Sequence, residues 1–85
     1  MTIIIETNKK TFARLKIGEL TMIVHEFNKQ VKVSDTIIFQ ETEDGKEYKD
    51  WTGEELSFKV TQIETEGCKT GFSAVAFKEM SVYND

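Results

Sequence analysis

The 85-residue chain has no proline, one cysteine and one histidine. The shortage of cysteine and histidine excludes two kinds of stabilising site. The single cysteine, Cys68, has no partner for an internal disulfide, and so few cysteine and histidine residues leave no cluster for structural zinc. A lone thiol without disulfides is typical of a reducing compartment, so we expect a cytoplasmic protein. We predict no metal site and no cofactor.

Long hydrophobic segments are also missing. Apolar runs such as Ile3–Ile5 and Met22–Val24 have three residues, whereas a membrane-spanning helix needs about 20. The hydrophobic fraction of 39%, with six Phe, two Tyr and one Trp, is nevertheless enough for a core. The length predicts one domain over residues 1–85, of which residues 81–85 form a loose C-terminal tail. We expect no membrane partner.

An overall positive charge, the usual mark of a nucleic-acid-binding domain, is absent because the net charge is −4. The charge is nonetheless unevenly distributed. Residues 1–34 carry six lysines and arginines against three acids, whereas residues 35–66 carry three against ten. The N-terminal third can therefore form a local basic face, although such lysines more often form the solvated side of a helix.

Alternating and β-branched segments predict five strands and one helix. The expected strands are residues 2–6, 20–27, 36–42, 56–60 and 72–80. Residues 8–17 predict a helix, with Thr7 as its N-cap and Gly18 at its C-terminal end. Both faces of the segment 20–27 are largely apolar, which predicts a central or barrel strand. A break in the alternation near Thr61–Gln62 indicates a β-bulge.

These elements predict an α+β fold, a small, partly closed β-barrel of five to six strands with one N-terminal helix across one mouth. Closure removes the exposed edges that an open five-stranded sheet leaves. We expect the segment 41–55 to be a long, exposed and acidic excursion that carries Tyr48 and Trp51.

Several short segments occur in an order found in one known superfamily. They are Lys16-Ile17-Gly18 with Thr21, Val33-Ser34-Asp35 before Ile37, Ile38, Phe39 and Glu41, Thr52-Gly53, Val60-Thr61 and the strand Gly71–Phe77. This order, over roughly residues 2–79, resembles the ASCH/PUA-like superfamily, and more closely its small uncharacterised bacterial and phage proteins. The resemblance implies a PUA-like barrel whose relatives bind RNA or modified nucleosides in a cleft between helix and barrel.

The chain departs from this pattern where the relatives carry positive charge. Glu19 and Leu20 stand where lysines follow the helix glycine, and His25 stands where the relatives have an arginine. Lys29 retains the positive charge where the relatives have an Asp-Arg stretch. Glu54 places a negative charge where the relatives have the arginine of a Thr-Gly-Arg turn. Arginines in such places are bidentate partners for phosphate or carboxylate, so their loss removes most of the electrostatic attraction for such a ligand.

The first functional hypothesis is a non-catalytic PUA/ASCH-like module that binds RNA or a nucleoside-type ligand along the helix side of the barrel. Its expected ligand-binding residues are Lys9, Lys10, Arg14, Lys16, Thr21, His25, Lys29 and Lys32. Two of these have plainer interpretations, because Thr21 fits an ordinary strand position and His25 a half-buried strand histidine.

Whether the chain is an enzyme stays open, and its residues favour a protein without catalytic activity. Some relatives resemble amidohydrolases that use a lysine, a threonine and a glutamate. Thr21 matches the hydroxyl, but no residue matches the lysine, and a hydroxyl without an adjacent base is a weak nucleophile. We predict no catalytic residue.

The second hypothesis is a small acidic protein, such as a phage encodes, that binds and modulates a host protein through its acidic aromatic loop 41–55. The expected contact residues are Glu43, Asp44, Glu47, Tyr48, Trp51 and Glu54. Aromatic residues among acids suit a basic protein surface better than nucleic acid, because phosphates would be repelled. The alternative for Trp51 is that it folds back over the open end of the barrel. The sequence leaves the oligomeric state open.

The segment Gly67–Gly71, with the sequence Gly-Cys-Lys-Thr-Gly, invites comparison with a phosphate-binding loop. The comparison fails because that motif needs a glycine directly before the lysine and a helix after it, whereas a strand is expected here. We therefore predict a surface loop with an incidental thiol.

Overall fold

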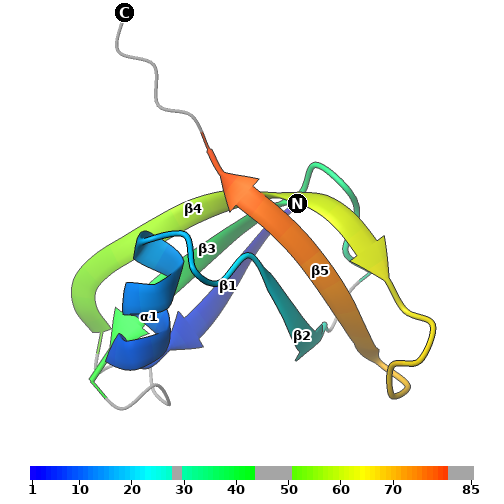
Figure 1. Cartoon of the computed structure of the whole chain (residues 1–85), viewed down its shortest axis with the longest axis horizontal. Coiled ribbons are helices and arrows are strands. Elements are labelled where there is room, and N and C mark those ends of the chain that lie inside the picture. The colour runs from blue at the N-terminus through cyan, green and yellow to red at the C-terminus, as the bar shows by residue number, and fades with distance from the viewer. Residues whose placement is uncertain (28–29, 44–50, 81–85) are drawn as a thin grey trace, which may run out of the picture.

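Five strands and one short helix make up the part of the chain that the computed structural model describes, residues 1–27, 30–43 and 51–80. In chain order they are β1 (Thr2–Thr7), α1 (Lys9–Lys16), β2 (Met22–Glu26), β3 (Thr36–Thr42), β4 (Trp51–Glu64) and β5 (Phe72–Glu79). The fold is α+β, and the strands form one curled sheet, a half-barrel, with α1 beside one end (Figure 1). The predicted α+β class and small barrel-like sheet are confirmed to this extent.

The strand order in the sheet is β1-β3-β4-β5-β2, so β1 and β2 are its two edges. β1 pairs with β3 in parallel, and the other neighbours pair antiparallel. Of the two predicted positions for segment 20–27, a central or a barrel strand, the central one is therefore wrong, because β2 is an edge strand of the half-barrel. Its second apolar face is not buried, since Met22 and Val24 are 52% and 62% exposed along the sheet edge.

The N-cap of α1 is Asn8 rather than Thr7. The Asn8 side-chain oxygen accepts a hydrogen bond from the backbone N–H of Thr11 at 2.7 Å, as an N-cap does. Thr7 instead ends β1, where its hydroxyl donates to the Gln40 carbonyl. Gly18 has the positive φ (80°) expected after the helix. Within the described residues, no helix is long and apolar enough to cross a membrane.

The core lies on the inner side of the curled sheet. Three phenylalanine rings, from Phe39, Phe58 and Phe77, contact one another with centroids 5.0–5.6 Å apart. The buried apolar residues are Ile5, Phe12, Leu15, Val31, Ile37, Phe39, Phe58, Val60, Val75 and Phe77. Phe12 and Leu15 come from α1, and their i, i+3 spacing forms the face by which this helix packs into the core.

The expected long excursion over 41–55 is shorter than predicted because both of its ends belong to strands, although residues 52–55 are exposed as expected. Thr42 is fully buried at the end of β3. Trp51 pairs with Thr42 and begins β4, which runs without a break to Glu64. Residues 44–50 lie outside the described part of the chain. The β-bulge expected near Thr61–Gln62 is confirmed, because the register of β4 against β5 shifts between Val60 and Gln62.

Candidate functional site

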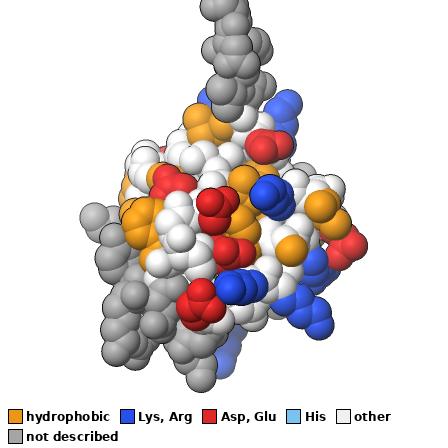
Figure 2. Space-filling view, turned by 90° about the vertical axis from the view of Figure 1, so that its left-hand side faces the viewer, with side chains coloured by type: hydrophobic (Ala, Val, Ile, Leu, Met, Phe, Trp, Pro, Cys, Tyr) orange, Lys and Arg blue, Asp and Glu red, His pale blue; other side chains and the backbone are white. Residues whose placement is uncertain are grey.

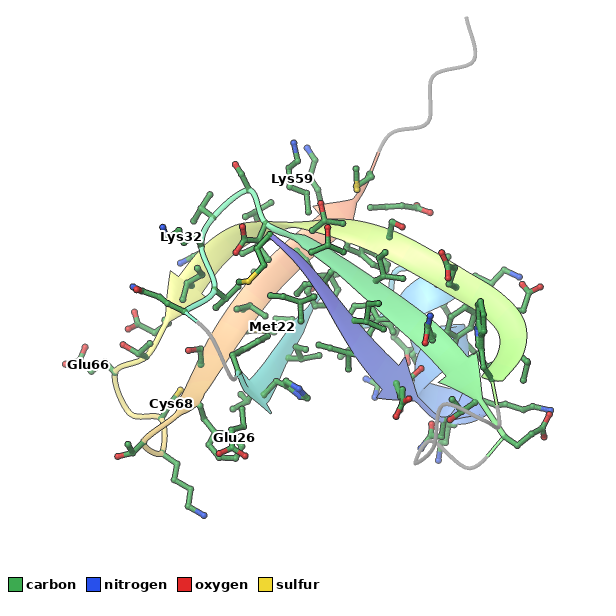
Figure 3. All side chains as sticks on the ribbon, turned by 180° about the vertical axis from the view of Figure 1, so that it is seen from behind. Met22, Glu26, Lys32, Lys59, Glu66 and Cys68 are labelled. Carbon is green, nitrogen blue, oxygen red and sulfur yellow. The ribbon has the colours of Figure 1, made fainter. Side chains whose placement is uncertain are left out.

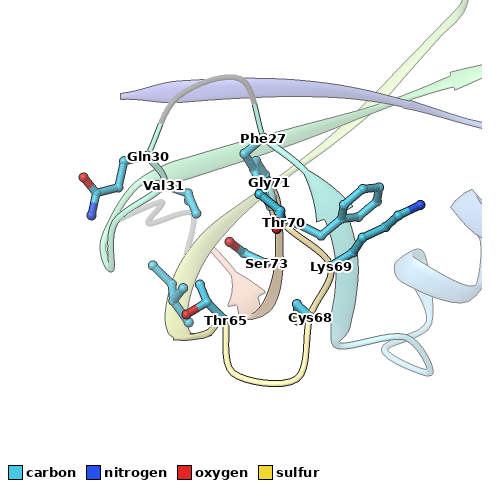
Figure 4. Close-up of a pocket in the computed structure, with 11 residues that line it drawn as sticks. Phe27, Gln30, Val31, Thr65, Cys68, Lys69, Thr70, Gly71 and Ser73 are labelled. Carbon is cyan, nitrogen blue, oxygen red and sulfur yellow. The ribbon is translucent and has the colours of Figure 1, made fainter.

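A cavity of ≈ 380 Å³ lies between the end of β2 and the loop that joins β4 to β5 (Figure 4). We refer to it as the loop cavity. Its lining consists of Phe27, Gln30, Val31, Ile63, Thr65, Cys68, Lys69, Thr70, Gly71, Phe72 and Ser73. Its lining residues thus come from β4, β5, the loop between them and the chain that follows β2.

The loop folds around this cavity because two glycines allow its turns. Gly67 and Gly71 have φ values of 84° and 87°, a conformation that other residues rarely adopt. The Cys68 backbone N–H donates to the Thr65 carbonyl at 3.0 Å, which closes one turn. The Phe27 N–H donates to the Gly71 carbonyl at 3.2 Å and fixes the end of β2 against the loop. The cavity is therefore bounded by hydrogen-bonded backbone on two sides.

The cavity combines apolar surfaces with hydrogen-bonding groups, one of which, Lys69, is charged. Val31 is 5% exposed and contributes an apolar wall together with Ile63 and the two phenylalanines. The polar lining residues are Gln30, Thr65, Thr70, Ser73 and Lys69. The Lys69 ammonium lies 5.9 Å from the centroid of the Phe72 ring, within the range of a cation–π contact. None of the described lining residues is acidic, but the Glu26 carboxylate lies next to Gly71, since a Cβ placed on this glycine would be 3.6 Å from Glu26 Oε2. The lining itself therefore suits a neutral or anionic ligand.

His25, the one histidine, faces a different opening. A second cavity of ≈ 320 Å³ lies between the first residues of β1 and the end of β2, and His25 lines it with Glu26 and Phe27. The His25 and Phe27 rings meet edge to face, 5.1 Å between centroids. This cavity is on the open side of the half-barrel, and neither cavity is lined by a residue of α1.

The structure disperses the other residues predicted to bind a nucleic-acid ligand. The four cations of α1 are exposed, and two of them are paired: Lys9 with Glu43 at 3.1 Å, and Arg14 with Glu19 at 2.7 Å. Figure 2 shows the side of the molecule where α1 and β4 lie, and acidic and basic side chains are interspersed on it.

The remaining members of that predicted set lie elsewhere. Thr21 is exposed, and its carbonyl accepts from the Phe77 N–H where β2 joins β5. Lys32 is exposed in the turn before β3, and Lys29 lies outside the described residues. Of the described members of this set, His25 alone lines one of the two cavities.

The residues expected to bind a protein partner are only partly described. Glu43 is engaged with Lys9, and Glu54 is exposed on β4. Trp51 is half-buried, and its indole N–H donates to the Glu54 carbonyl at 3.0 Å. The indole is therefore held by its own strand. Asp44, Glu47 and Tyr48 lie outside the described residues.

Sequence reasoning missed the residues of the loop cavity. It treated Gly67–Gly71 as a plain surface loop because the segment fails the phosphate-loop spacing. The available signal was the pair of glycines around a lysine and a threonine, which brings polar groups to a turn next to the half-buried Cys68. Among the described residues, no three His, Cys, Asp or Glu side chains are grouped so that they could hold a metal ion.

Comparison with known proteins does not assign a family: no protein-family model matches the sequence, and no curated protein matches it significantly. The resemblance to the ASCH/PUA-like superfamily therefore stays an interpretation of the sequence segments quoted above.

Proposed function

We propose that the chain is a non-catalytic PUA-like module that binds RNA or a nucleoside-type ligand, and that the base of the ligand enters the loop cavity. The observation that carries this proposal is the composition of that cavity, in which phenylalanine side chains, hydroxyl groups and one lysine line the same space and no described lining residue is acidic.

Each part of this lining has a counterpart in a nucleoside. Aromatic side chains provide faces on which unstacked bases stack, and single-stranded RNA is read mainly in this way. Hydroxyl and amide groups, here from Thr70, Ser73 and Gln30, both donate and accept, so they suit base edges and ribose hydroxyls. A volume of ≈ 380 Å³ lies within the range of small-molecule sites. Lys69 adds one positive charge for a phosphate.

This proposal moves the site away from the helix. The cations of α1 are exposed and partly neutralised by Glu19 and Glu43, so they offer little that a solvated helix face would not. The alternative, an acidic surface for a basic host protein, has less support among the described residues. Glu43 and the Trp51 indole already have partners within the chain.

The single thiol provides a direct test, because Cys68 is the only cysteine and lines the cavity. The rate of its reaction with a thiol reagent such as DTNB is measured with each of the four ribonucleosides and with a ten-nucleotide single-stranded RNA. We expect at least one of them to slow the reaction several-fold and saturably. Lys69→Gln should weaken the protection by RNA, whereas Lys16→Gln, an equal loss of charge on α1, should not.

Two results would count against this proposal. One is an unchanged Cys68 reaction rate with every nucleoside and with the RNA at millimolar concentration. The other is protection that Lys16→Gln weakens and Lys69→Gln does not, since the ligand would then bind on the helix side after all.

A further inference from the structure

Four polar side chains lie in one row across the outer face of the sheet. The strand register places Thr2 opposite Thr36, Thr36 opposite Lys59, and Lys59 opposite Lys78. Residues directly opposite one another on paired strands point to the same face, so the row runs across β1, β3, β4 and β5. Thr36 is half-exposed and the other three are exposed. We call these four residues the outer row.

The two lysines of the outer row form an unfavourable pair. Side chains directly opposite each other on antiparallel strands have Cβ atoms about 4.5–5.5 Å apart, and like charges there are destabilising. Neither Lys59 nor Lys78 is in an ion pair within the described part of the chain. Within the described part of the chain, two lysine positions are thus paired on one face of the sheet without a counter-charge.

The acids nearest in sequence do not neutralise this pair. Glu79 follows Lys78 and therefore points to the opposite face of β5. Asp35 precedes Thr36, but one of its carboxylate oxygens lies 3.1 Å from the Met1 ammonium and the other accepts the Lys32 N–H at 2.8 Å.

The next rows on the same face keep acids at a distance. One row consists of Ile4, Ile38 and Ser57, which carry no charge. Glu55 and Glu6 come in the row after that. Glu55 is four residues from Lys59 along β4, roughly 13 Å. Among the described residues, the outer row is therefore locally positive, although the chain as a whole is acidic.

A third lysine stands near the outer row. The Ser34 N–H donates to the Val60 carbonyl and the Val60 N–H donates to the Asp35 carbonyl, both at 2.9 Å, so the turn that carries Lys32 is bonded next to Lys59. In the view of Figure 3, Lys32 lies between Cys68 and Lys59 along one side of the molecule. Lys32 thus lies between the loop cavity and the outer row, and Glu66 lies on the same side of the molecule, nearer to Cys68.

We propose that Lys59 and Lys78 together bind a backbone phosphate of an RNA strand, with the Thr36 hydroxyl beside them as a further donor. A phosphate shared between two ammonium groups would remove their repulsion and form two charge-assisted hydrogen bonds. This inference rests on the proposed function and narrows it. Ser73 in the cavity and Lys78 are five residues apart along β5, roughly 17 Å, and this odd separation places their side chains on opposite faces of the sheet. One nucleoside cannot occupy both places, so the ligand is an RNA strand.

Titrations of a labelled ten-nucleotide RNA with wild type, Lys59→Gln, Lys78→Gln and Lys10→Gln test this proposal. Lys10 is exposed on α1 and has no ion pair in the described structure, so it is a matched loss of one charge. We expect either outer-row variant to lower the slope of log K against log salt by about 0.7. Over the tenfold range from 1 M to 0.1 M salt, this change in slope corresponds to an affinity for RNA about fivefold lower at 0.1 M. Lys10→Gln should leave both values unchanged.

The Cys68 protection assay separates this inference from the proposed function. If it is right, the outer-row variants keep wild-type protection by a nucleoside while they lose affinity for RNA. Equal affinity and salt slope in wild type and both outer-row variants would overturn the phosphate site, even if nucleosides still protect Cys68. Loss of RNA affinity in these variants without any protection of Cys68 would support the phosphate site and overturn the cavity.

Inorganic phosphate distinguishes a strand from a free ion. Phosphate and chloride are compared at equal ionic strength by their effect on the melting temperature of wild type and of Lys78→Gln. If phosphate at millimolar concentration stabilises only the wild type and displaces no RNA, the site takes a free anion and the assignment to an RNA strand is wrong. Displacement of RNA by phosphate, reduced in Lys78→Gln, supports it.

Discussion

The Met1 ammonium lies 3.1 Å from Oδ1 of Asp35, across 34 residues of chain. The other oxygen of this carboxylate accepts the Lys32 N–H at 2.8 Å, and the Asp35 carbonyl accepts the Val60 N–H at 2.9 Å. One residue thus joins the start of β1, the turn before β3, and β4. The Lys32 N–H, and then the Met1 ammonium, hold the pKa of Asp35 below its ordinary value.

This lowered pKa predicts a loss of stability in acid. A carboxylate whose pKa is lower in the folded chain stabilises it above its unfolded pKa, and this contribution disappears as the pH falls through the folded value. The free energy of unfolding of wild type should exceed that of Asp35→Asn at pH 7, and the gap should narrow below about pH 4. Urea denaturation between pH 2 and 7 measures both, with Glu66→Gln as an exposed control. A gap that stays constant with pH would show that the carboxylate charge plays no part.

Thr42 predicts a second, pH-independent effect. Its side chain is fully buried, and its hydroxyl donates to the Thr7 carbonyl at 3.1 Å, which ties the ends of β1 and β3. Thr42→Val keeps the shape and removes this donor, so we expect a loss of about 1 kcal/mol in the free energy of unfolding. Thr61→Val, exposed on β4, should change it by less than about 0.5 kcal/mol. Equal effects of the two would contradict this role of the hydroxyl.

The strands and the helix could be predicted from the sequence because their signals are local. Periodic apolar residues gave α1, and Gly18 gave its end. The N-cap was assigned one residue too early, since Thr7 and Asn8 are both good caps and only pairing with β3 decides between them. Segment 20–27 was misjudged because apolar residues on both faces of a strand look the same whether the strand is central or at an exposed edge.

The candidate site could not be predicted because it depends on strand register and on a loop. Lys59 and Lys78 are 19 positions apart, and only the pairing of β4 with β5, bulge included, places them opposite each other. The loop cavity brings Phe27 and Gln30 to residues about 40 positions later in the chain. The lysines of α1 were predicted as ligand-binding residues because they are close in sequence. Closeness in sequence does not show which other side chains lie beside them.

The core predicts a large and specific loss of stability. Phe39 is 1% exposed and contacts both other rings of the core, with centroids 5.6 Å from Phe58 and 5.3 Å from Phe77. Phe39→Ala should cost about 3–5 kcal/mol, a large part of what holds a domain of this size folded. Phe72→Ala, at a half-buried position, should cost clearly less. Thermal and urea unfolding measure the stability of both variants. Similar losses for the two would contradict a central position of Phe39 in the core.

The outer row predicts a substitution that stabilises the chain. Lys78→Glu replaces a like-charged cross-strand pair with an opposite-charged one against Lys59, so the free energy of unfolding should rise by about 0.5 kcal/mol at low salt. The gain should shrink as salt is added, because exposed charges are screened within about 10 Å at 0.1 M. Lys10→Glu on α1 is the matched control and gains no cross-strand partner. The same Lys78→Glu protein should lose affinity for RNA, so stability and binding should change in opposite directions. If Lys78→Glu lowered both the free energy of unfolding and the affinity for RNA, the two lysines would support the fold, and their repulsion would already be relieved within the chain.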